Sequence, residues 1–217
     1  MRGAPQAVGQ DARVDNAPGL ADVIRFVDVP ATSPTVALTF DDGPNPPDTV
    51  ELLDLLARER VPAVFCLVGV QVQAHPDLVR RIVDDGHVLA NHSWRHDDLA
   101  QLTPDAVRAD LVRTLDAIHA VVPDAPVPFF RAPFGHWGRT IGVAAELGMR
   151  SLEWQLAVED WDPAPPADVL VERLGGIEPG GVVLLHDGGG DRSATVEAVR
   201  RVIPRLRSDG WTFTVPR

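Results

Sequence analysis

The chain has 217 residues, of which 45% are hydrophobic and 24% are charged, a composition typical of a globular protein with one sizeable core. It carries 20 Lys and Arg against 31 Asp and Glu, a formal net charge of −11, which would repel a phosphate backbone and excludes general nucleic-acid binding. No apolar run approaches the roughly 18 residues that a membrane-spanning helix needs, so we expect no integral membrane segment. The single cysteine, Cys66, excludes an intrachain disulfide and a multi-cysteine metal site. Any metal ligands must therefore be His, Asp or Glu.

The first thirty-odd residues are rich in Ala, Pro, Gly and Asp and show no sustained periodicity. We therefore expect residues 1–34 to form an arm or a loosely packed lead-in, and residues 35–217 to form one domain. Residues 1–20 lack the apolar stretch of a signal peptide. The location that we expect is extracytoplasmic, at the cell envelope, with an export leader absent from this chain; the alternative is the cytoplasm.

From Thr35 onward, short apolar runs alternate with amphipathic segments, which predicts β-strands alternating with α-helices. The longest predicted helix begins after Thr103, a favourable N-cap residue, and its apolar residues recur at helical spacing as far as Val122. The predicted strands are residues 35–40, 61–69, 87–91, 127–130, 149–157, 182–185 and 211–215, and the other predicted helices are residues 48–60, 76–86, 140–147, 167–174 and 195–207.

This alternation predicts an α/β fold with parallel strands and helices outside them, either closed as a barrel or open as a doubly wound sheet. In both architectures the reactive groups belong at the C-terminal ends of the strands, where the connecting loops gather. Ionisable side chains follow several predicted strands, namely Asp41 and Asp42, His92, Arg131, Asp160 and His186. The sequence therefore predicts a reactive site at this edge of the sheet.

Each motif around these residues also has a purely structural interpretation. The segment from Thr39 to Pro44 suits an ordinary turn, although its two adjacent carboxylates repel each other, which a cation would relieve. His92 and His96 are four residues apart, on one face if their segment is helical, and an isolated pair of this kind is often solvated or packed in a core. Ser93 stands where the zinc-protease pattern His-Glu-x-x-His has its glutamate, so that pattern is absent.

The later motifs are individually weaker. The segment from Arg131 to Gly135 suits a surface loop, but an arginine at a strand end can also hold a carboxylate in its ionised form. A buried tryptophan or a capped histidine would explain the pair Asp160-Trp161 and the segment from Leu184 to Asp187.

Taken together, in this order, these segments resemble the motifs of the polysaccharide deacetylase family, the NodB-like carbohydrate esterases of family four, over residues 35–215. The resemblance implies a distorted (β/α) barrel, commonly with seven strands, and a divalent metal site for removing acetyl groups from sugars. By matching positions, the resemblance implies that Asp42, His92 and His96 are the metal ligands. It implies that Asp41 is the general base, oriented by Arg131, and that His186 is the general acid, tuned by Asp160. Trp161 and Leu184 would line a pocket for the acetyl methyl group.

Phe134 stands where many members of that family carry a tyrosine. The role implied for this position is a backbone N–H in the oxyanion hole, and phenylalanine supplies that group equally well. The missing hydroxyl puts only a substrate contact in doubt.

The chemistry of these residue types fits amide hydrolysis. A metal held by two imidazoles and one carboxylate can lower the pKa of bound water to about 7, and a second carboxylate can take the remaining proton. An amine leaves poorly unless it is protonated, so an acid is required as well. Zinc is the metal that we expect first, although cobalt, nickel and iron also accept an Asp-His-His set.

We therefore predict a metal-dependent hydrolase that removes N-acetyl groups from an N-acetylglucosamine-containing glycan, either a chitin-like oligosaccharide or peptidoglycan. One alternative keeps the fold and changes the substrate to acetylated xylan or a cyclic amide. Another is a non-catalytic glycan-binding module, which is disfavoured because pure binding needs neither Asp41 nor His186. Trp94, Trp137 and His136 lie near the motifs and are candidates for stacking on a sugar ring or for packing. The glycan's length and the oligomeric state are not predicted.

Overall fold

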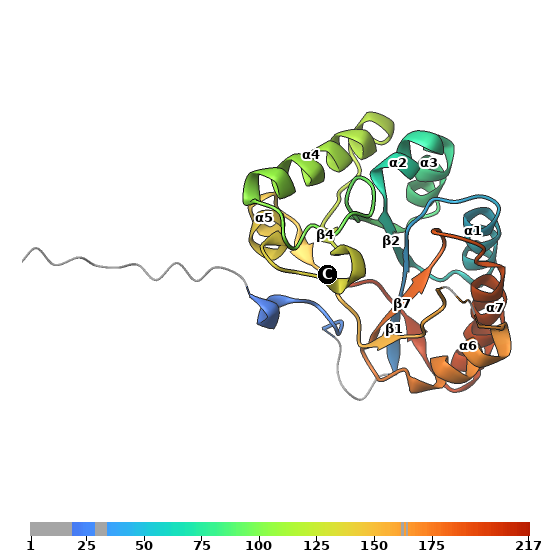
Figure 1. Cartoon of the computed structure of the whole chain (residues 1–217). Helices are drawn as coiled ribbons and strands as arrows, with labels where there is room; N and C mark the ends of the chain where they lie inside the picture. Colours follow the sequence, from blue (N-terminus) through green and yellow to red (C-terminus); the bar gives the residue numbers. More distant parts are fainter. Residues whose placement is uncertain (1–18, 29–33, 162, 164) are drawn as a thin grey trace, which may run out of the picture.

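The computed structural model describes residues 19–28, 34–161, 163 and 165–217. Its centre is a curled sheet of parallel strands with helices around the outside (Figure 1). Seven strands follow one another in the order β5-β4-β3-β2-β1-β7-β6, and β8 pairs with the start of β1. This arrangement confirms the predicted distorted (β/α) barrel. The strands are β1 (Thr35–Asp41), β2 (Ala63–Leu67), β3 (Val88–Asn91), β4 (Phe129–Phe130), β5 (Arg150–Ser151), β6 (Leu156–Ala157), β7 (Val182–His186) and β8 (Thr212–Phe213).

Helices connect most of the successive strands and cover the sheet, whereas β5 and β6 follow each other without a helix (Figure 1). The longest, α4, starts as predicted, because the Oγ1 atom of Thr103 accepts a hydrogen bond from the backbone N–H of Ala106. Its buried face carries Val107, Leu111 and Ile118, which follow the helical spacing of the sequence. The helices are α1 (Asp48–Glu59), α2 (Gly69–Ala74), α3 (Pro76–Asp84), α4 (Pro104–Val121), α5 (Thr140–Glu146), α6 (Ala167–Arg173) and α7 (Ser193–Ser208), with short 3-10 turns at Leu20–Asp22, Pro133–Gly135 and Leu174–Gly176.

Strand β1 lies in the middle of the sheet, between β2 and β7, and every residue of it is buried. Its register with the neighbouring strands pairs Asp41 with Cys66 on one side and with His186 on the other. Parallel strands end at a common edge, so this register brings the carboxylate of Asp41 and the imidazole of His186 to the same edge of the sheet.

Two features of the structure differ from the predicted elements. The predicted strand 149–157 is interrupted, because residues 152–155 separate β5 from β6. Within this interval, Leu152 and Glu153 use their carbonyl oxygens to accept hydrogen bonds from the side chain of Arg131. Helix α2 was not predicted, since six residues are too few to show a helical period.

The lead-in is more firmly packed than the sequence predicted, as far as the structure describes it. Val23, Ile24 and Val27 are buried, because these apolar residues fill the gap between β5 and the start of β7. The Ile24 N–H donates to the Ser151 carbonyl at 2.9 Å, and the Val27 N–H donates to the Gly180 carbonyl at 2.7 Å. The remainder of the predicted lead-in, residues 1–18 and 29–33, lies outside the described residues.

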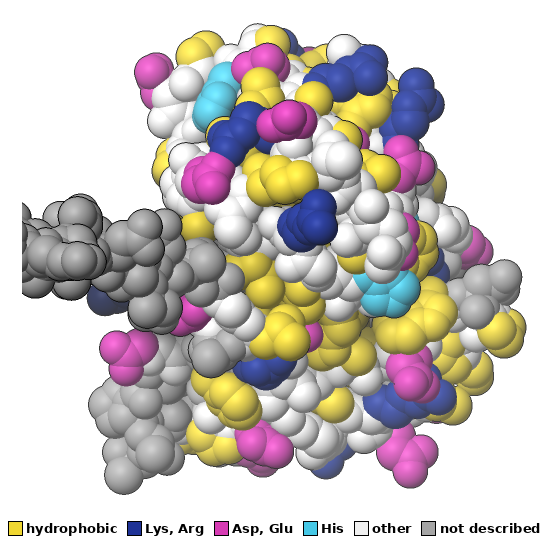
Figure 2. Space-filling model, turned by 60° about the vertical axis from the view of Figure 1, so that its left-hand side comes forward, with side chains coloured by type: hydrophobic (Ala, Val, Ile, Leu, Met, Phe, Trp, Pro, Cys, Tyr) yellow, Lys and Arg dark blue, Asp and Glu magenta, His cyan; other side chains and the backbone are white. Residues whose placement is uncertain are grey.

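Figure 2 shows one face of the molecule, on which acidic and basic side chains are interspersed around a central area of hydrophobic side chains. No continuous basic area crosses this face, so it offers no track for a phosphate backbone. Among the described residues, no helix is long and apolar enough to cross a membrane.

Candidate active site

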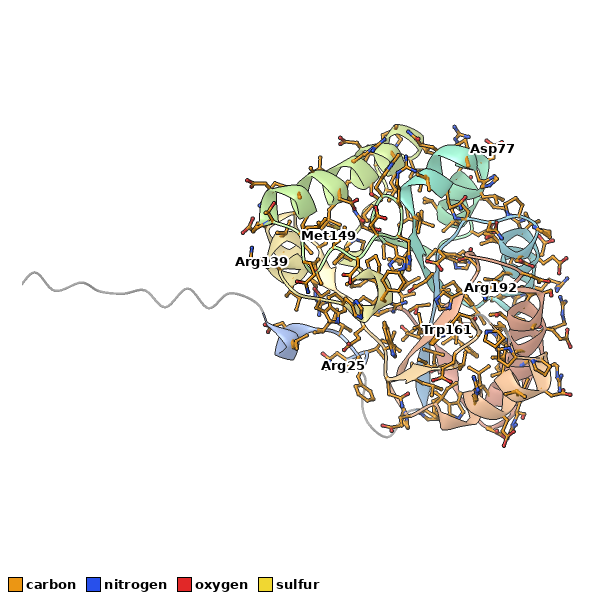
Figure 3. The ribbon with its side chains drawn as sticks, in the orientation of Figure 1. Arg25, Asp77, Arg139, Met149, Trp161 and Arg192 are labelled. Carbon is orange, nitrogen blue, oxygen red and sulfur yellow. The ribbon has the colours of Figure 1, made fainter. Side chains whose placement is uncertain are left out.

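A cavity of about 630 Å³ opens at the C-terminal ends of the strands, where the sequence predicted the reactive groups. Trp161 and Arg192 lie on the β7 side of the molecule (Figure 3) and line this cavity. Two further predicted residues, Arg131 and Asp160, support its wall through hydrogen bonds to Asp41 and His186. The predicted residues that line the cavity are Asp41, Asp42, His92, His96, Phe134, Trp161, Leu184 and His186.

Asp42, His92 and His96 converge on one point of the cavity. The Asp42 Oδ1 atom lies 3.4 Å from the Nε2 atoms of both histidines. His92 donates from Nδ1 to the Arg131 carbonyl at 2.8 Å, which leaves its Nε2 lone pair directed at Asp42. Asp42 Oδ1 is buried with no hydrogen-bond partner among the described residues. One carboxylate oxygen and two imidazole nitrogens in this arrangement fit a divalent cation.

The ligand cluster depends on an irregular backbone. Asp42, Ser93 and His96 have φ angles of 73°, 67° and 62°, in the left-handed region that residues other than glycine rarely adopt. The segment from His92 to His96 is therefore a loop and not the helical turn that their spacing allowed. Two local hydrogen bonds hold this loop: Asn91 Oδ1 accepts from the Ser93 N–H at 3.0 Å, and Ser93 Oγ accepts from the His96 N–H at 2.9 Å.

Asp41 is the second carboxylate of the site, and Arg131 fixes it. Arg131 is fully buried and donates from Nη1 to Asp41 Oδ1 at 2.7 Å. Its other donors reach Thr39 Oγ1 at 2.7 Å, the Leu152 carbonyl at 3.1 Å and the Glu153 carbonyl at 2.9 Å. Burial alone would lower the pKa of Arg131, but the charge of Asp41 raises it, so the guanidinium remains charged. The other oxygen of Asp41, Oδ2, lies 3.7 Å from His92 Nε2 and faces the ligand cluster.

The carboxylate and the imidazoles of the ligand cluster have pKa values that burial and neighbouring charges shift. Burial by itself would raise the pKa of Asp42, but the adjacent imidazoles of His92 and His96 hold it far below its usual range. The pKa of His96 is lowered, first by burial and then by the charge of His92. Burial would also lower the pKa of His92, but the charges of Asp41 and Asp42 outweigh it and raise this pKa, so metal binding would have to displace a proton from this imidazole. An ionised carboxylate and a neutral imidazole are the forms that bind a metal ion.

His186 and Asp160 form a hydrogen-bonded pair on the opposite side of the cavity. His186 donates from Nδ1 to Asp160 Oδ1 at 2.7 Å, and its backbone N–H donates to Asp160 Oδ2 at 2.9 Å. Thr195 Oγ1 donates to the same Oδ2 atom at 2.8 Å. Burial disfavours the charged imidazole, but the hydrogen bond and the charge of Asp160 outweigh it and raise the pKa of His186 above its usual value.

A sequence model of the polysaccharide deacetylase family matches residues 28–152 of the chain. The chain belongs to the polysaccharide deacetylase family. It is 37% identical over 203 residues to a chitooligosaccharide deacetylase of Sinorhizobium fredii, a match that covers 88% of this chain and 94% of that protein.

Solved structures of the family agree with the fold. The Bc1960 peptidoglycan N-acetylglucosamine deacetylase superposes with a TM-score of 0.80 at 33% identity, covering 86% of this chain and 87% of that one. A family 4 acetyl xylan esterase from Clostridium thermocellum, solved with a cobalt ion, superposes with a TM-score of 0.76 at 33% identity, covering 83% of this chain and 87% of that one.

In this member of the polysaccharide deacetylase family, two exposed aromatic residues flank the cavity. Phe134 is 61% exposed and its ring lies 4.5 Å from that of His96, while Trp161 is 40% exposed and packs edge-on against His186. Phe134 also has a positive φ angle, 59°. Leu184 also lines the cavity.

The other aromatic candidates named from the sequence lie elsewhere. Trp94 and Trp137 are 4% and 5% exposed, so they pack in the core and do not present a face to a sugar. His136 is outside the cavity wall and pairs with Asp98 at 2.8 Å. A second tryptophan, Trp154, lines the cavity together with Trp161; it was missed because it lies inside the predicted strand 149–157 and belongs to no motif.

Asp187 is a further buried carboxyl group that the sequence analysis did not single out. It follows His186, is 1% exposed, and its Oδ2 atom lies 2.6 Å from Thr49 Oγ1. Burial and the nearby charges of Asp42 and Asp41 raise its pKa to about 7. A side chain at Gly43 would clash with this carboxyl group, because an added Cβ would lie only 2.2 Å from Asp187 Oδ2. Asp187 therefore packs directly beneath the turn that carries Asp42.

Proposed function

We propose that this protein is a metal-dependent deacetylase that hydrolyses the N-acetyl groups of an N-acetylglucosamine-containing glycan, either a chitin-like oligosaccharide or peptidoglycan. The observation that carries the proposal is the placement of three groups around one cavity. A ligand cluster, an arginine-held carboxylate and a carboxylate-held histidine all line or support its wall. The names of the similar proteins support the same substrate class.

The metal would be held by Asp42, His92 and His96. When bound, a divalent cation acidifies water to a pKa of about 7 and polarises a carbonyl group. Zinc is our first choice, and the cobalt ion in the acetyl xylan esterase structure supports a site that also accepts other divalent ions.

Asp41 is the proposed general base. Its Oδ1 atom is occupied by Arg131, so Oδ2 is the atom that takes a proton from the attacking water. The buried guanidinium pairs with this carboxylate and fixes its orientation. A base held in this way loses no free energy to reorientation when the proton moves.

His186 is the proposed general acid. Its Nδ1 atom is bound to Asp160, so Nε2 is the atom that donates a proton to the leaving nitrogen of the sugar. The raised pKa of His186 keeps a useful fraction protonated near neutral pH. This step is needed because an unprotonated amine is a poor leaving group.

The remaining predicted residues bind the acetyl group. The backbone N–H of Phe134 would donate to the oxygen that becomes negatively charged, a contribution of about 3 kcal/mol per donor in other hydrolases. Trp161 and Leu184 would enclose the methyl group on the His186 side of the cavity.

An acetylxylan esterase activity is the second candidate, because one of the similar solved structures is an acetyl xylan esterase. The two candidates share the site and differ in the leaving group, an amine in one and an alcohol in the other. An alcohol needs the proton from His186 less than an amine does.

The test is acetate release from chitooligosaccharides, peptidoglycan fragments and acetylated xylan, with free amines measured in parallel. We expect one acetate and one free amine per cleaved group on the N-acetylated glycans. Release of acetate from xylan alone would favour the esterase. No release from any glycan, by metal-loaded protein, would contradict both candidates.

A further inference from the structure

Arg192 is a buried arginine at the cavity that none of the family motifs includes. It is 5% exposed and immediately precedes α7. No carboxylate of the described residues forms an ion pair with its guanidinium, although burying an unpaired charge is costly unless hydrogen bonds satisfy it. The hydrogen bonds of this buried guanidinium must therefore come from groups other than carboxylates.

Three backbone carbonyl groups satisfy this guanidinium. Nε donates to the Gly188 carbonyl at 2.7 Å, Nη1 to the Asp160 carbonyl at 2.7 Å and Nη2 to the Gly189 carbonyl at 3.2 Å. Residue 160 lies in the loop after β6, and residues 188 and 189 lie in the loop after β7. One side chain therefore ties together two loops at the same edge of the sheet.

These two loops carry the two members of the acid pair. Asp160 is held through its own carbonyl oxygen, while its carboxylate binds His186 and Thr195. His186 lies two residues before Gly188, at the end of β7. Arg192 thus bridges the backbone of Asp160 and the backbone that follows His186.

Arginine suits this contact better than lysine. The planar guanidinium of arginine presents N–H donors in fixed directions and can bind three oxygens at once, whereas the donors of lysine all lie on one nitrogen at the end of a flexible stem. The loop is also closely packed: a Cβ on Gly189, whose φ angle is +71°, would lie 2.6 Å from Asp42 Oδ2 and 3.5 Å from Arg192 Nη2. The guanidinium therefore holds a loop that has no room to shift toward Asp42.

We propose that Arg192 is a positioning residue for proton donation to the leaving group, acting by fixing the backbone on both sides of the His186–Asp160 pair. This inference rests on the proposed function. It predicts that Arg192 matters most for substrates whose leaving group needs a proton, and less for substrates whose leaving group departs without one.

The test compares Arg192→Lys with the matched control Arg201→Lys in the full-length, metal-loaded protein. Arg201 lies in α7, the helix that Arg192 precedes; it is exposed and pairs with Asp168 at 2.7 Å. For each variant, kcat/KM is measured on an N-acetylated chitooligosaccharide and on 4-nitrophenyl acetate, whose phenolate departs unprotonated.

We expect Arg192→Lys to lower kcat/KM on the amide by about tenfold or more, because a misplaced acid forfeits part of a contribution of about 10²–10⁴. The loss on the aryl ester should be under about threefold on the same argument, and Arg201→Lys should change neither rate. A variant that is only partly folded loses both activities in the same proportion. Equal losses on the two substrates, or no loss on either, would overturn the proposal.

A second readout does not depend on activity. The pKa of His186, followed by NMR in metal-free protein, should fall toward its usual value of about 6.5 in Arg192→Lys and stay unchanged in Arg201→Lys. An unchanged His186 titration in Arg192→Lys would contradict the positioning role. If the unaltered protein releases no acetate from any glycan, the proposed function fails, and this titration still decides the role of Arg192.

Discussion

Asp41 and Asp42 are neighbours in the sequence but have different partners in the structure. Asp41 ends β1 with Oδ1 bound to Arg131, whereas the left-handed backbone at Asp42 turns its carboxylate toward His92 and His96. Strand geometry alone would point consecutive side chains to opposite faces. The positive φ angle of Asp42 is what brings both carboxylates to the same cavity.

This difference predicts that the two carboxylates respond differently to the same substitution. Asp41→Asn should leave the metal bound and lower kcat by about 10² or more, because the proposed base is lost. Asp42→Asn should instead lose the metal, because the amide oxygen is a weaker ligand than the carboxylate. Elemental analysis and kcat on the same samples separate the two effects. If Asp41→Asn lost its metal while Asp42→Asn kept it, the roles within the pair would be reversed.

The His186–Asp160 pair makes a prediction about pH. The raised pKa of His186 means that the proton is available at neutral pH and is lost as the pH rises through that pKa. Asp160→Asn removes the stabilising charge, so the basic limb of kcat/KM against pH should move to lower pH. The acidic limb should move much less. A basic limb that stays in place would show that another group sets it.

At the scale of elements, hydrophobic periodicity located the long helices and the central strands, because their core faces are determined locally. Periodicity did not predict the break between β5 and β6. Apolar residues recur in both halves of residues 149–157, and the break depends on hydrogen bonds with Arg131 and Ile24, which are distant in the sequence. The position of the site followed from the polar residues at strand ends. Trp154 and Arg192 had no comparable signal, since they reach the cavity only through tertiary packing.

The connection between β2 and β3 contains a histidine that should make stability depend on pH. His87 is 7% exposed and accepts a hydrogen bond at Nδ1 from the Ala63 N–H at 3.2 Å, while its buried Nε2 atom has no hydrogen-bond partner in the part of the chain that the structure describes. Burial lowers its pKa to about 4. The unfolded chain, with a histidine pKa of about 6.5, therefore binds the proton more readily than the folded chain does.

The stabilisation from neutral His87 is fully present above about pH 6.5 and is lost as the pH falls from about 6.5 toward about 4. Between pH 7 and pH 5 we expect a loss of about 2 kcal/mol in the free energy of unfolding from this group alone. Urea unfolding at both pH values checks it, with His87→Asn as the control that accepts the same hydrogen bond but does not titrate. Equal pH dependence in the two proteins would exclude His87 as the cause.

At the scale of the whole molecule, the described part of the lead-in completes the sheet. Ile24 pairs with Leu152 beside β5, and Phe26 pairs with Gly181 just before β7. The Glu153 N–H also donates to the Ile24 carbonyl at 2.8 Å, next to the carbonyl that binds Arg131. The segment from Val23 to Val27 thus joins the two sides of the curled sheet close to the anchor of the proposed base.

This packing predicts a measurable difference within one short segment. Ile24 is 8% exposed and Phe26 is 48% exposed. Ile24→Ala should lower the free energy of unfolding by about 2–3 kcal/mol, as for other buried isoleucines, whereas Phe26→Ala should change it by less than about 0.5 kcal/mol. Urea unfolding of both variants measures the difference. Equal, small effects would mean that the lead-in is only loosely attached.

The central claim is that one metal at Asp42, His92 and His96 makes this cavity a deacetylase. Its most direct test titrates zinc into chelator-treated protein and follows, in the same samples, metal bound per chain and acetate released from an N-acetylated chitooligosaccharide. We predict that acetate release is absent at the start, rises in proportion to bound metal and saturates at one metal per chain. Acetate release at the full rate from metal-free protein would contradict the account.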